Sequence, residues 1–246
     1  YLAEVNWHLP FAVYLLPLIS IVLSVYLKRS MENESAIVSK SEVKAPVTAD
    51  PVTVPGKYGV DIKHLVQIMC FYGLATYLVI IVSFNLPFLM KEYKFTSGNS
   101  GLMISLFFLA IMAPGFILND LFKQKTKFVS LLAIALGMAL ILISRTEWLI
   151  GLGCIFIGFG YGVIQPIAYD KTTRTAIPEK VTLALAFVMA MNYLAILLCP
   201  FIIDFFQSMF HVKSQQFAFI FNLCIALVAT IWAYVKRDSF LFNDKI

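Results

Sequence analysis

From Ile150 to Pro166 the sequence reads IGLGCIFIGFGYGVIQP, which places five glycines in one short segment. The segment lies inside a run without Asp, Glu, Lys or Arg that extends from Trp148 to Tyr169. In water, a helix would lose about 1 kcal/mol for each glycine relative to alanine. In a bilayer, small residues instead let neighbouring helices approach closely. The segment therefore predicts a membrane-spanning helix.

Two interpretations of this helix remain open. Gly151, Gly158 and Gly162 are spaced seven and four residues apart, so they share one helical face. That face predicts a packing seam in which Gly158 and Gly162 contact a neighbouring helix. Alternatively, Tyr161 and Gln165 beside the glycines, followed by a proline, indicate a broken helix with a polar stripe that lines a transport path.

The composition of the whole chain excludes a soluble domain. Of its 246 residues, 60% are hydrophobic and 13% are charged, with a mean hydropathy of +0.84. A soluble domain carries about 25% charged residues. The net charge of +5 comes from residues in short loops, so it indicates membrane topology and not nucleic-acid binding. The cysteines and histidines show neither disulfide nor metal-ligand spacing, and we expect no metal and no cofactor.

Uncharged runs long enough to span a bilayer occur seven times, and each should form a helix because lipid leaves no other partner for the backbone. The runs are Leu9–Leu27, His64–Met90, Phe95–Asn119, Phe128–Ser144, Trp148–Tyr169, Val181–Ile203 and Ser214–Val235. The predicted organisation is a first transmembrane helix at 1–27, a polar linker at 28–63, and a six-helix transmembrane bundle at 64–246.

The charge distribution predicts the orientation. The linker, the C-terminus and the loops on their side of the membrane hold 15 of the 19 Lys and Arg residues. Because cytoplasmic loops carry the excess of basic residues, we expect the linker and the C-terminus to be cytoplasmic, in a multi-pass protein of the cell inner membrane.

The last six helices can be divided into two trios of opposite topology. The first helix of one trio is residues 64–90, and the first helix of the other is residues 148–169. Both leading helices contain glycine, an amide side chain and proline. Interrupted helices at corresponding positions of two repeats indicate the binding site of a transporter.

Several segments resemble one membrane transporter family. They are NWHLPF at 6–11, FNLPF at 84–88, SGNSGL at 97–102, the glycine run at 158–166 and IPEK at 177–180. Gly115, Asn119 and Asp120, followed by Lys123, form a degenerate copy of the signature Gly-x-x-x-Asp-Arg-x-Gly-Arg-Arg, in which Phe122 replaces the second glycine. With the helix count and the linker, these segments resemble the C-terminal half of a major facilitator superfamily transporter of the drug-efflux type.

This resemblance implies an all-α membrane protein of seven transmembrane helices, the last six forming one bundle of an alternating-access transporter. It implies a missing N-terminal six-helix half as partner and a gating loop at Asp120 and Lys123. The expected function is secondary active transport of a small-molecule substrate, as proton-coupled efflux. Sugar or organic-anion transport is the alternative within the superfamily, and a seven-helix receptor is a more distant one. An enzyme is disfavoured, because the spans supply no convergent His, Asp or Glu.

The candidate substrate-binding residues are the polar side chains within the uncharged runs. They are Tyr77, Asn85, Tyr161, Gln165 and Asn192. Each could instead hydrogen-bond a neighbouring helix or simply pack against one. Asp204 is the acidic residue nearest to a span interior, at the outer end of its run.

Overall fold

The structure is a computed structural model that describes residues 59–117, 126–212 and 214–236. These residues belong to one compact unit that extends from Thr53 to Ile246. The predicted first helix at 1–27, almost all of the linker, and the loop with Asp120 and Lys123 lie outside the described residues.

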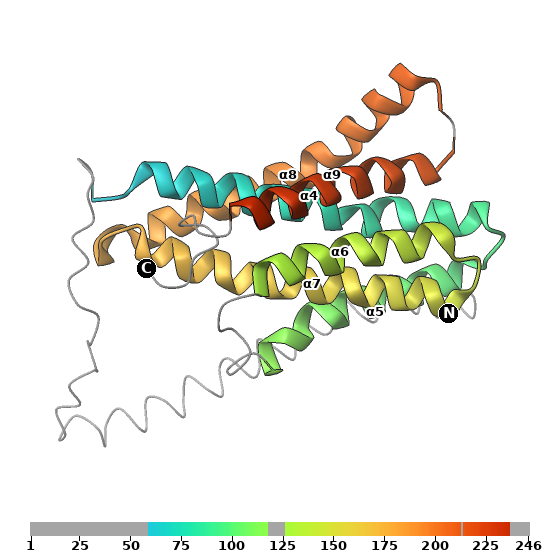
Figure 1. Ribbon diagram of the computed structural model, residues 1–246, viewed down its shortest axis with the longest axis horizontal. Helices are drawn as coiled ribbons and strands as arrows, with labels where there is room; N and C mark the ends of the chain where they lie inside the picture. Colours follow the sequence, from blue (N-terminus) through green and yellow to red (C-terminus); the bar gives the residue numbers. More distant parts are fainter. Residues whose placement is uncertain (1–58, 118–125, 213, 237–246) are drawn as a thin grey trace, which may run out of the picture. The chain divides into compact units, whose positions relative to one another are not determined.

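Within those ranges the chain forms six α-helices and one short 3₁₀-helix, which carry the labels of Figure 1. Their bounds are α4 Ile62–Glu92, α5 Ser97–Ile117, α6 Thr126–Ile143, α7 Glu147–Arg174, η2 Pro178–Lys180, α8 Val181–Phe210 and α9 Gln216–Val235. Each α-helix overlaps one of the last six predicted runs. Five are long and apolar enough to cross a membrane, and the apolar part described for α6, Val129–Ile143, is shorter.

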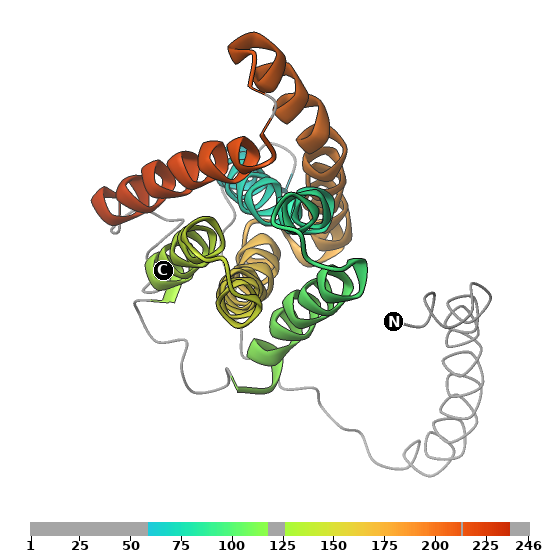
Figure 2. The ribbon, with the colours of Figure 1, turned by 90° about the vertical axis from the view of Figure 1, so that its right-hand side faces the viewer.

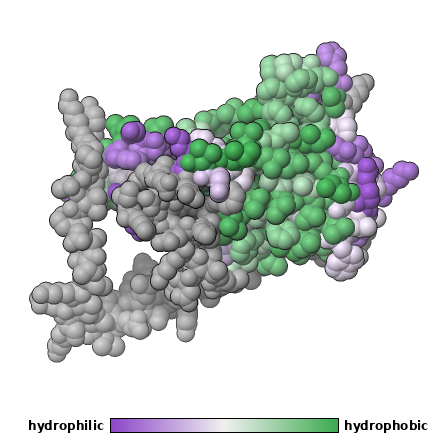
Figure 3. Space-filling model, in the orientation of Figure 1, coloured by the Kyte–Doolittle hydropathy of each residue, from purple (hydrophilic) through white to green (hydrophobic). Residues whose placement is uncertain are grey.

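The surface agrees with a membrane location for these helices. On the face drawn in Figure 3, apolar side chains cover the middle of the described helices, and hydrophilic side chains gather toward both ends. An apolar band between two polar ends is the pattern that a lipid bilayer selects. The described part therefore has the helices of a multi-pass membrane protein.

The interpretation of α7 as a broken helix is wrong. The helix continues through Pro166 and ends only at Arg174, beyond the predicted limit at Tyr169. A proline removes one backbone hydrogen bond, and membrane helices tolerate this loss when their neighbours hold them in place. The final turns carry Lys171, which is buried, and the exposed pair of Asp170 and Arg174, whose charged groups lie 3.0 Å apart.

One face of α7 lies directly against α5. A Cβ atom added at Gly158 would overlap the backbone carbonyl of Phe107, and one at Gly162 would overlap that of Ile111. Because both obstacles are backbone atoms, no side-chain rotation could make room. The two helices are therefore as close here as glycine allows.

A second face of α7 lies equally close to α6. A Cβ at Gly153 would lie 2.7 Å from the carbonyl oxygen of Gly137, and one at Gly160 would lie 2.5 Å from that of Ser130. The glycines therefore serve two neighbours: Gly151, Gly158 and Gly162 share the face toward α5, and Gly153 and Gly160 lie on the face toward α6. With α5 and α6 on these faces, a further face of α7 is left to meet α4 (Figure 2).

The remaining helices pack around α4 and α6. α8 rests mainly on α4 and α9 mainly on α6 (Figures 1 and 2). α8 buries one narrow stripe and leaves most of its other large side chains exposed. The buried stripe consists of Ala184, Val188, Ala195, Cys199 and Ile203.

We predict that Gly158→Leu and Gly162→Leu will each prevent correct assembly. A leucine side chain would have to displace the backbone of α5, so the yield of folded protein should fall severalfold. Gly101→Leu is the matched control, because nothing lies within 4 Å of a Cβ at that glycine. The measurement is the monodisperse fraction in size-exclusion chromatography after detergent extraction. Equal yields for Gly158→Leu and Gly101→Leu would contradict the close approach of α5 and α7.

At the end of the bundle where α4 begins, here named the linker end, the chain before α4 is attached to the connection between α7 and α8. Val60 and Ala176 form an isolated antiparallel bridge, and the Asp61 backbone N–H donates to the Thr175 carbonyl at 2.8 Å. The turn before the bridge uses Gly59 at φ +71°, a conformation that glycine adopts without strain.

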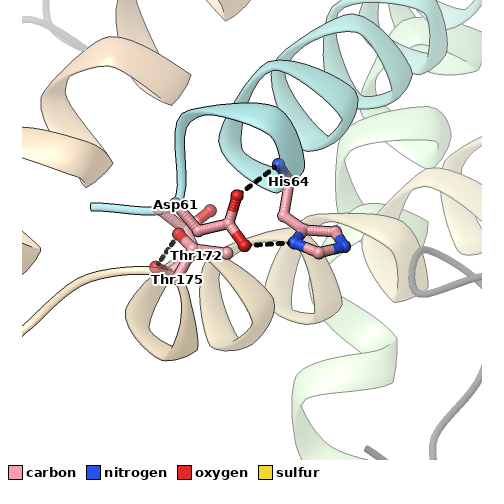
Figure 4. Close-up of polar contacts among 4 residues, drawn as sticks. All are labelled: Asp61, His64, Thr172 and Thr175. Carbon is pink, nitrogen blue, oxygen red and sulfur yellow. Dashed lines mark hydrogen bonds and ion pairs between the residues drawn. The ribbon is translucent and has the colours of Figure 1, made fainter. Parts of the chain in front are cut away.

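The first turn of α4 is capped by the Asp61 side chain (Figure 4). Its Oδ1 accepts from the His64 backbone N–H at 3.2 Å, and its Oδ2 lies 2.5 Å from the His64 Nδ1. On the facing segment, the Thr175 hydroxyl donates to the Thr172 carbonyl at 2.8 Å. The hydrogen bonds from His64 lower the pKa of Asp61 below its ordinary value.

We predict that Asp61→Ala lowers the stability by about 1 kcal/mol at neutral pH, because α4 loses its N-cap. Asp61→Asn keeps a capping oxygen but removes the charge. Because the folded-state pKa is depressed, the charge contribution is present above the ordinary pKa and disappears as the pH falls through the folded value. The melting temperatures of wild type and Asp61→Asn should therefore differ at pH 7 and converge only as the pH falls below the ordinary Asp pKa of about 3.9. A constant difference across this range would contradict the role of the charge.

Candidate functional site

Hydroxyl and amide side chains from three helices meet inside the bundle. The Thr76 Oγ1 on α4 lies 2.6 Å from the Asn192 Oδ1 on α8 and 3.0 Å from the Tyr161 hydroxyl on α7. The Tyr161 hydroxyl also lies 3.1 Å from the Asn192 Oδ1 and 3.1 Å from the Tyr72 hydroxyl. These four residues form the centre of what we name the tyrosine–amide network.

The network continues along α7 toward the linker end. The Tyr72 hydroxyl lies 3.2 Å from the Tyr169 hydroxyl, and the Gln165 Nε2 donates to the Tyr169 hydroxyl at 3.4 Å. Tyr161, Gln165 and Tyr169 follow one another at intervals of four residues, so they share a stripe of α7. The tyrosine–amide network thus comprises Tyr72, Thr76, Tyr161, Gln165, Tyr169 and Asn192.

The tyrosine rings fix the geometry of the network. The rings of Tyr72 and Tyr161 are nearly parallel, at 8°, with their centroids 6.0 Å apart. Tyr169 meets Tyr72 edge-on, at 67° and 5.6 Å. Both arrangements are favoured for aromatic pairs and hold the hydroxyls in position.

The network is closed on one side and open on the other. Tyr72, Thr76 and Tyr161 are buried, whereas Asn192 and Gln165 are only half-buried. Within the described residues, the Asn192 Nδ2 and the Gln165 Oε1 make no hydrogen bond, which leaves one amide donor and one amide acceptor at the open side.

The helices that form the network are uncharged up to Tyr169, which is followed on α7 by Asp170 and the buried Lys171. Residues 64–90 of α4, 148–169 of α7 and 181–203 of α8 contain no Asp, Glu, Lys or Arg. A charge at the bilayer centre costs at least about 2.5 kcal/mol on insertion scales, whereas hydroxyls and amides can satisfy one another. The centre of the network therefore offers hydrogen bonds and aromatic rings and contains no charged side chain.

The structure joins three of the five predicted binding residues. Tyr161, Gln165 and Asn192 are members of the network, and the other two are not. Tyr77 is buried, and its hydroxyl is near Asn222 of α9 without a hydrogen bond of normal geometry. Asn85 is half-buried on α4, about 13 Å along the helix axis from Thr76.

Sequence reasoning missed the other three members of the network. Tyr72 and Thr76 are four residues apart on α4, which was a usable signal for a polar stripe facing α7. Tyr169 follows Gln165 at the same interval of four residues that separates Tyr161 from Gln165. Because it precedes the charged Asp170, it marks the predicted end of the span.

Polar contacts also join the helices at the opposite end of the bundle, here named the far end. The Glu92 carboxylate at the end of α4 accepts from the Ser214 hydroxyl and the Gln215 backbone N–H, both at 3.0 Å. The Arg145 guanidinium lies 4.2 Å from the centroid of the Tyr93 ring. Burial raises the pKa of the Tyr93 phenol, and Arg145 partly opposes the increase. These contacts connect α4 to the loops before α7 and α9.

The fold and the network define a class: a multi-pass helical membrane protein with an uncharged polar site between its spans. The model of the Major Facilitator Superfamily matches residues 1–200 of the chain. The chain therefore belongs to the major facilitator superfamily, whose members are transporters and not enzymes. Searches of curated proteins and of solved structures found no significant match.

Proposed function

We propose that the chain forms part of a secondary active transporter that exports small, largely apolar molecules by alternating access. The observation that carries this proposal is the tyrosine–amide network, in which α4, α7 and α8 contribute neutral hydrogen-bonding groups to one place between the spans. Aromatic rings supply apolar contact, and the half-buried amides of Gln165 and Asn192 supply orientation.

The proposal includes a second helical bundle that faces this one across the substrate path. Two helices expose wide apolar faces that the described bundle does not use. Leu109 of α5 is 65% exposed and Phe201 of α8 is 64% exposed. In transporters built from repeats, substrate binds near the membrane midplane between the two halves. We propose the N-terminal six-helix half as the partner, and the loop with Asp120 and Lys123 as part of the gate.

The proposed energy source is a proton gradient, and the group that binds the proton belongs to that second bundle. A coupled carrier needs a side chain that changes its charge within the path, and the hydroxyls and amides of the network do not titrate near neutral pH. Asp204 is the alternative on this chain. It lies exposed on α8, five residues beyond the buried Cys199.

Sugar transport is the second candidate, because hydroxyl and amide side chains beside aromatic rings also suit a sugar. Organic anions are disfavoured, because residues 64–90, 148–169 and 181–203, which contribute the network, contain no Lys or Arg to pair with a carboxylate, and Lys171 lies beyond them on α7. Uptake of radiolabelled glucose by cells that express the intact transporter separates a sugar carrier from an exporter.

We predict that cells expressing the intact transporter will export Nile red or ethidium faster than cells without it, and that a protonophore will abolish the difference. Tyr161→Phe should slow this export by about three- to tenfold, because one hydroxyl leaves the network. Tyr193→Phe is the matched control, since Tyr193 is 69% exposed on the same helix as Asn192. Export of neither dye would contradict the proposed function. Equal effects of the two substitutions would show that the tyrosine–amide network is not the substrate site of the proposed transporter.

We predict that Asp204→Asn will leave export dependent on an imposed pH gradient, because Asp204 lies outside the network. The measurement is dye flux in membrane vesicles with and without the gradient. Loss of the pH dependence with dye binding intact would identify Asp204 as the coupling residue and contradict its assignment to the second bundle.

The proposed orientation places the linker in the cytoplasm. In a background from which every native cysteine has been removed, a membrane-impermeant maleimide should label Lys94→Cys in intact cells and label Glu42→Cys only after lysis. This expectation rests on the excess of Lys and Arg residues on the linker side of the membrane. Reversed labelling would invert the topology.

A further inference from the structure

The shortest hydrogen bond of the tyrosine–amide network joins Thr76 to Asn192. The Thr76 Oγ1 lies 2.6 Å from the Asn192 Oδ1, compared with 3.0 Å to the Tyr161 hydroxyl and 3.0 Å to the backbone carbonyl of Tyr72. A threonine hydroxyl carries one proton. The shortest of the three distances assigns that proton to the Asn192 oxygen.

A second hydroxyl supports the same orientation of the amide. The Tyr161 hydroxyl lies 3.1 Å from the Asn192 Oδ1, so two hydroxyls from two helices converge on one carbonyl oxygen. An amide has an acceptor end and a donor end. With the acceptor end held by the Thr76 hydroxyl of α4 and with the Tyr161 hydroxyl of α7 beside it, the Nδ2 donor end remains at the half-buried side of Asn192.

We propose that Thr76 is a positioning residue that orients the Asn192 amide so that its N–H group faces the substrate, and that the substrate is therefore an uncharged molecule with a carbonyl or ether oxygen. This inference rests on the proposed transport function and specifies its substrate class. The fixed N–H donor binds an oxygen acceptor, whereas a ligand without such an oxygen leaves this donor unpaired. Residues 64–90, 148–169 and 181–203 also contain no Asp or Glu that could pair with a cation. Such mismatches of donors and acceptors are the strongest source of discrimination between small ligands.

The orientation of Asn192 can be tested without any substrate. In purified Asn192→Asp, the new carboxyl group occupies the place of the amide, and its protonation is followed by the infrared carbonyl band of the acid form. If Thr76 donates to this position, it stabilises the carboxylate. Adding Thr76→Val should then raise the pH of half-ionisation by about one to two units. Adding Thr76→Ser should leave that pH near its value in Asn192→Asp alone.

Thr230→Val supplies the matched control for this measurement. Thr230 is a buried threonine of α9 whose hydroxyl donates to the Ala226 carbonyl at 2.7 Å, four residues earlier, outside the network. Adding it to Asn192→Asp should leave the half-ionisation pH unchanged. Thr76→Ala provides a second removal of the hydroxyl if the valine variant does not fold. An unchanged titration in both Thr76 variants would overturn the positioning role.

The substrate class is tested with two dyes in cells that express the intact transporter. Nile red is neutral and has a ring carbonyl, whereas ethidium is a cation with N–H donors and no oxygen. We expect export of Nile red and little export of ethidium. Thr76→Val should slow Nile red export by about three- to tenfold, and Thr76→Ser should restore it. Asn192→Asp should reverse the preference toward ethidium, because a carboxylate attracts a cation.

The outcomes separate the substrate class from the proposed function. Export of ethidium in preference to Nile red by the wild type would overturn the substrate class and leave the transport function standing. Export of neither dye would overturn both, while the infrared titration would still decide whether Thr76 orients residue 192. Export of Nile red that is insensitive to Thr76→Val would confine the role of Thr76 to helix packing.

Discussion

The contact between glycine and backbone on two faces of α7 is the constraint on which the arrangement of the bundle depends. Gly158 and Gly162 admit the carbonyl groups of α5, and Gly153 and Gly160 admit those of α6. In a bilayer, moving the apolar surface of a helix from lipid to a helix contact yields little hydrophobic free energy. Short-range dispersion contacts must therefore hold the helices together. Because α5 and α6 occupy two sides of α7, its polar stripe is directed toward α4 and α8.

The glycines determine the distances from α7 to α5 and α6. The tyrosine–amide network determines the axial positions of α4 and α8 relative to α7. Thr76 and Tyr72 of α4 must lie at the depth of Tyr161 for their hydroxyls to meet, and Asn192 of α8 must lie there too. A buried polar group without a partner costs free energy that an apolar contact does not recover. The network therefore favours one axial position of α8, a helix that otherwise rests on a narrow apolar stripe.

The helices could be predicted from the sequence because the absence of charge over about 20 residues is a strong and simple signal. The stripe of Tyr161 and Gln165 was equally visible from their spacing. The role of Thr76 was not visible, because a threonine in a span looks the same whether it bonds to another helix or only to the carbonyl four residues earlier, as Thr230 does. Tyr77, next to Thr76 in sequence, points about 100° away around α4, so only the packing of α4 could separate the two residues.

The bridge between Val60 and Ala176 has a consequence for the order in which the chain assembles. Its two residues are separated by α4, α5, α6 and α7, so closing the bridge requires all four helices to be inserted and α7 to lie beside α4. Contacts between such distant residues form late, because the entropy of closing the loop must be offset by packing that already exists. The segment before α4 therefore becomes fixed at the linker end only after α4 to α7 have come together, and its backbone hydrogen bonds mark that stage of assembly.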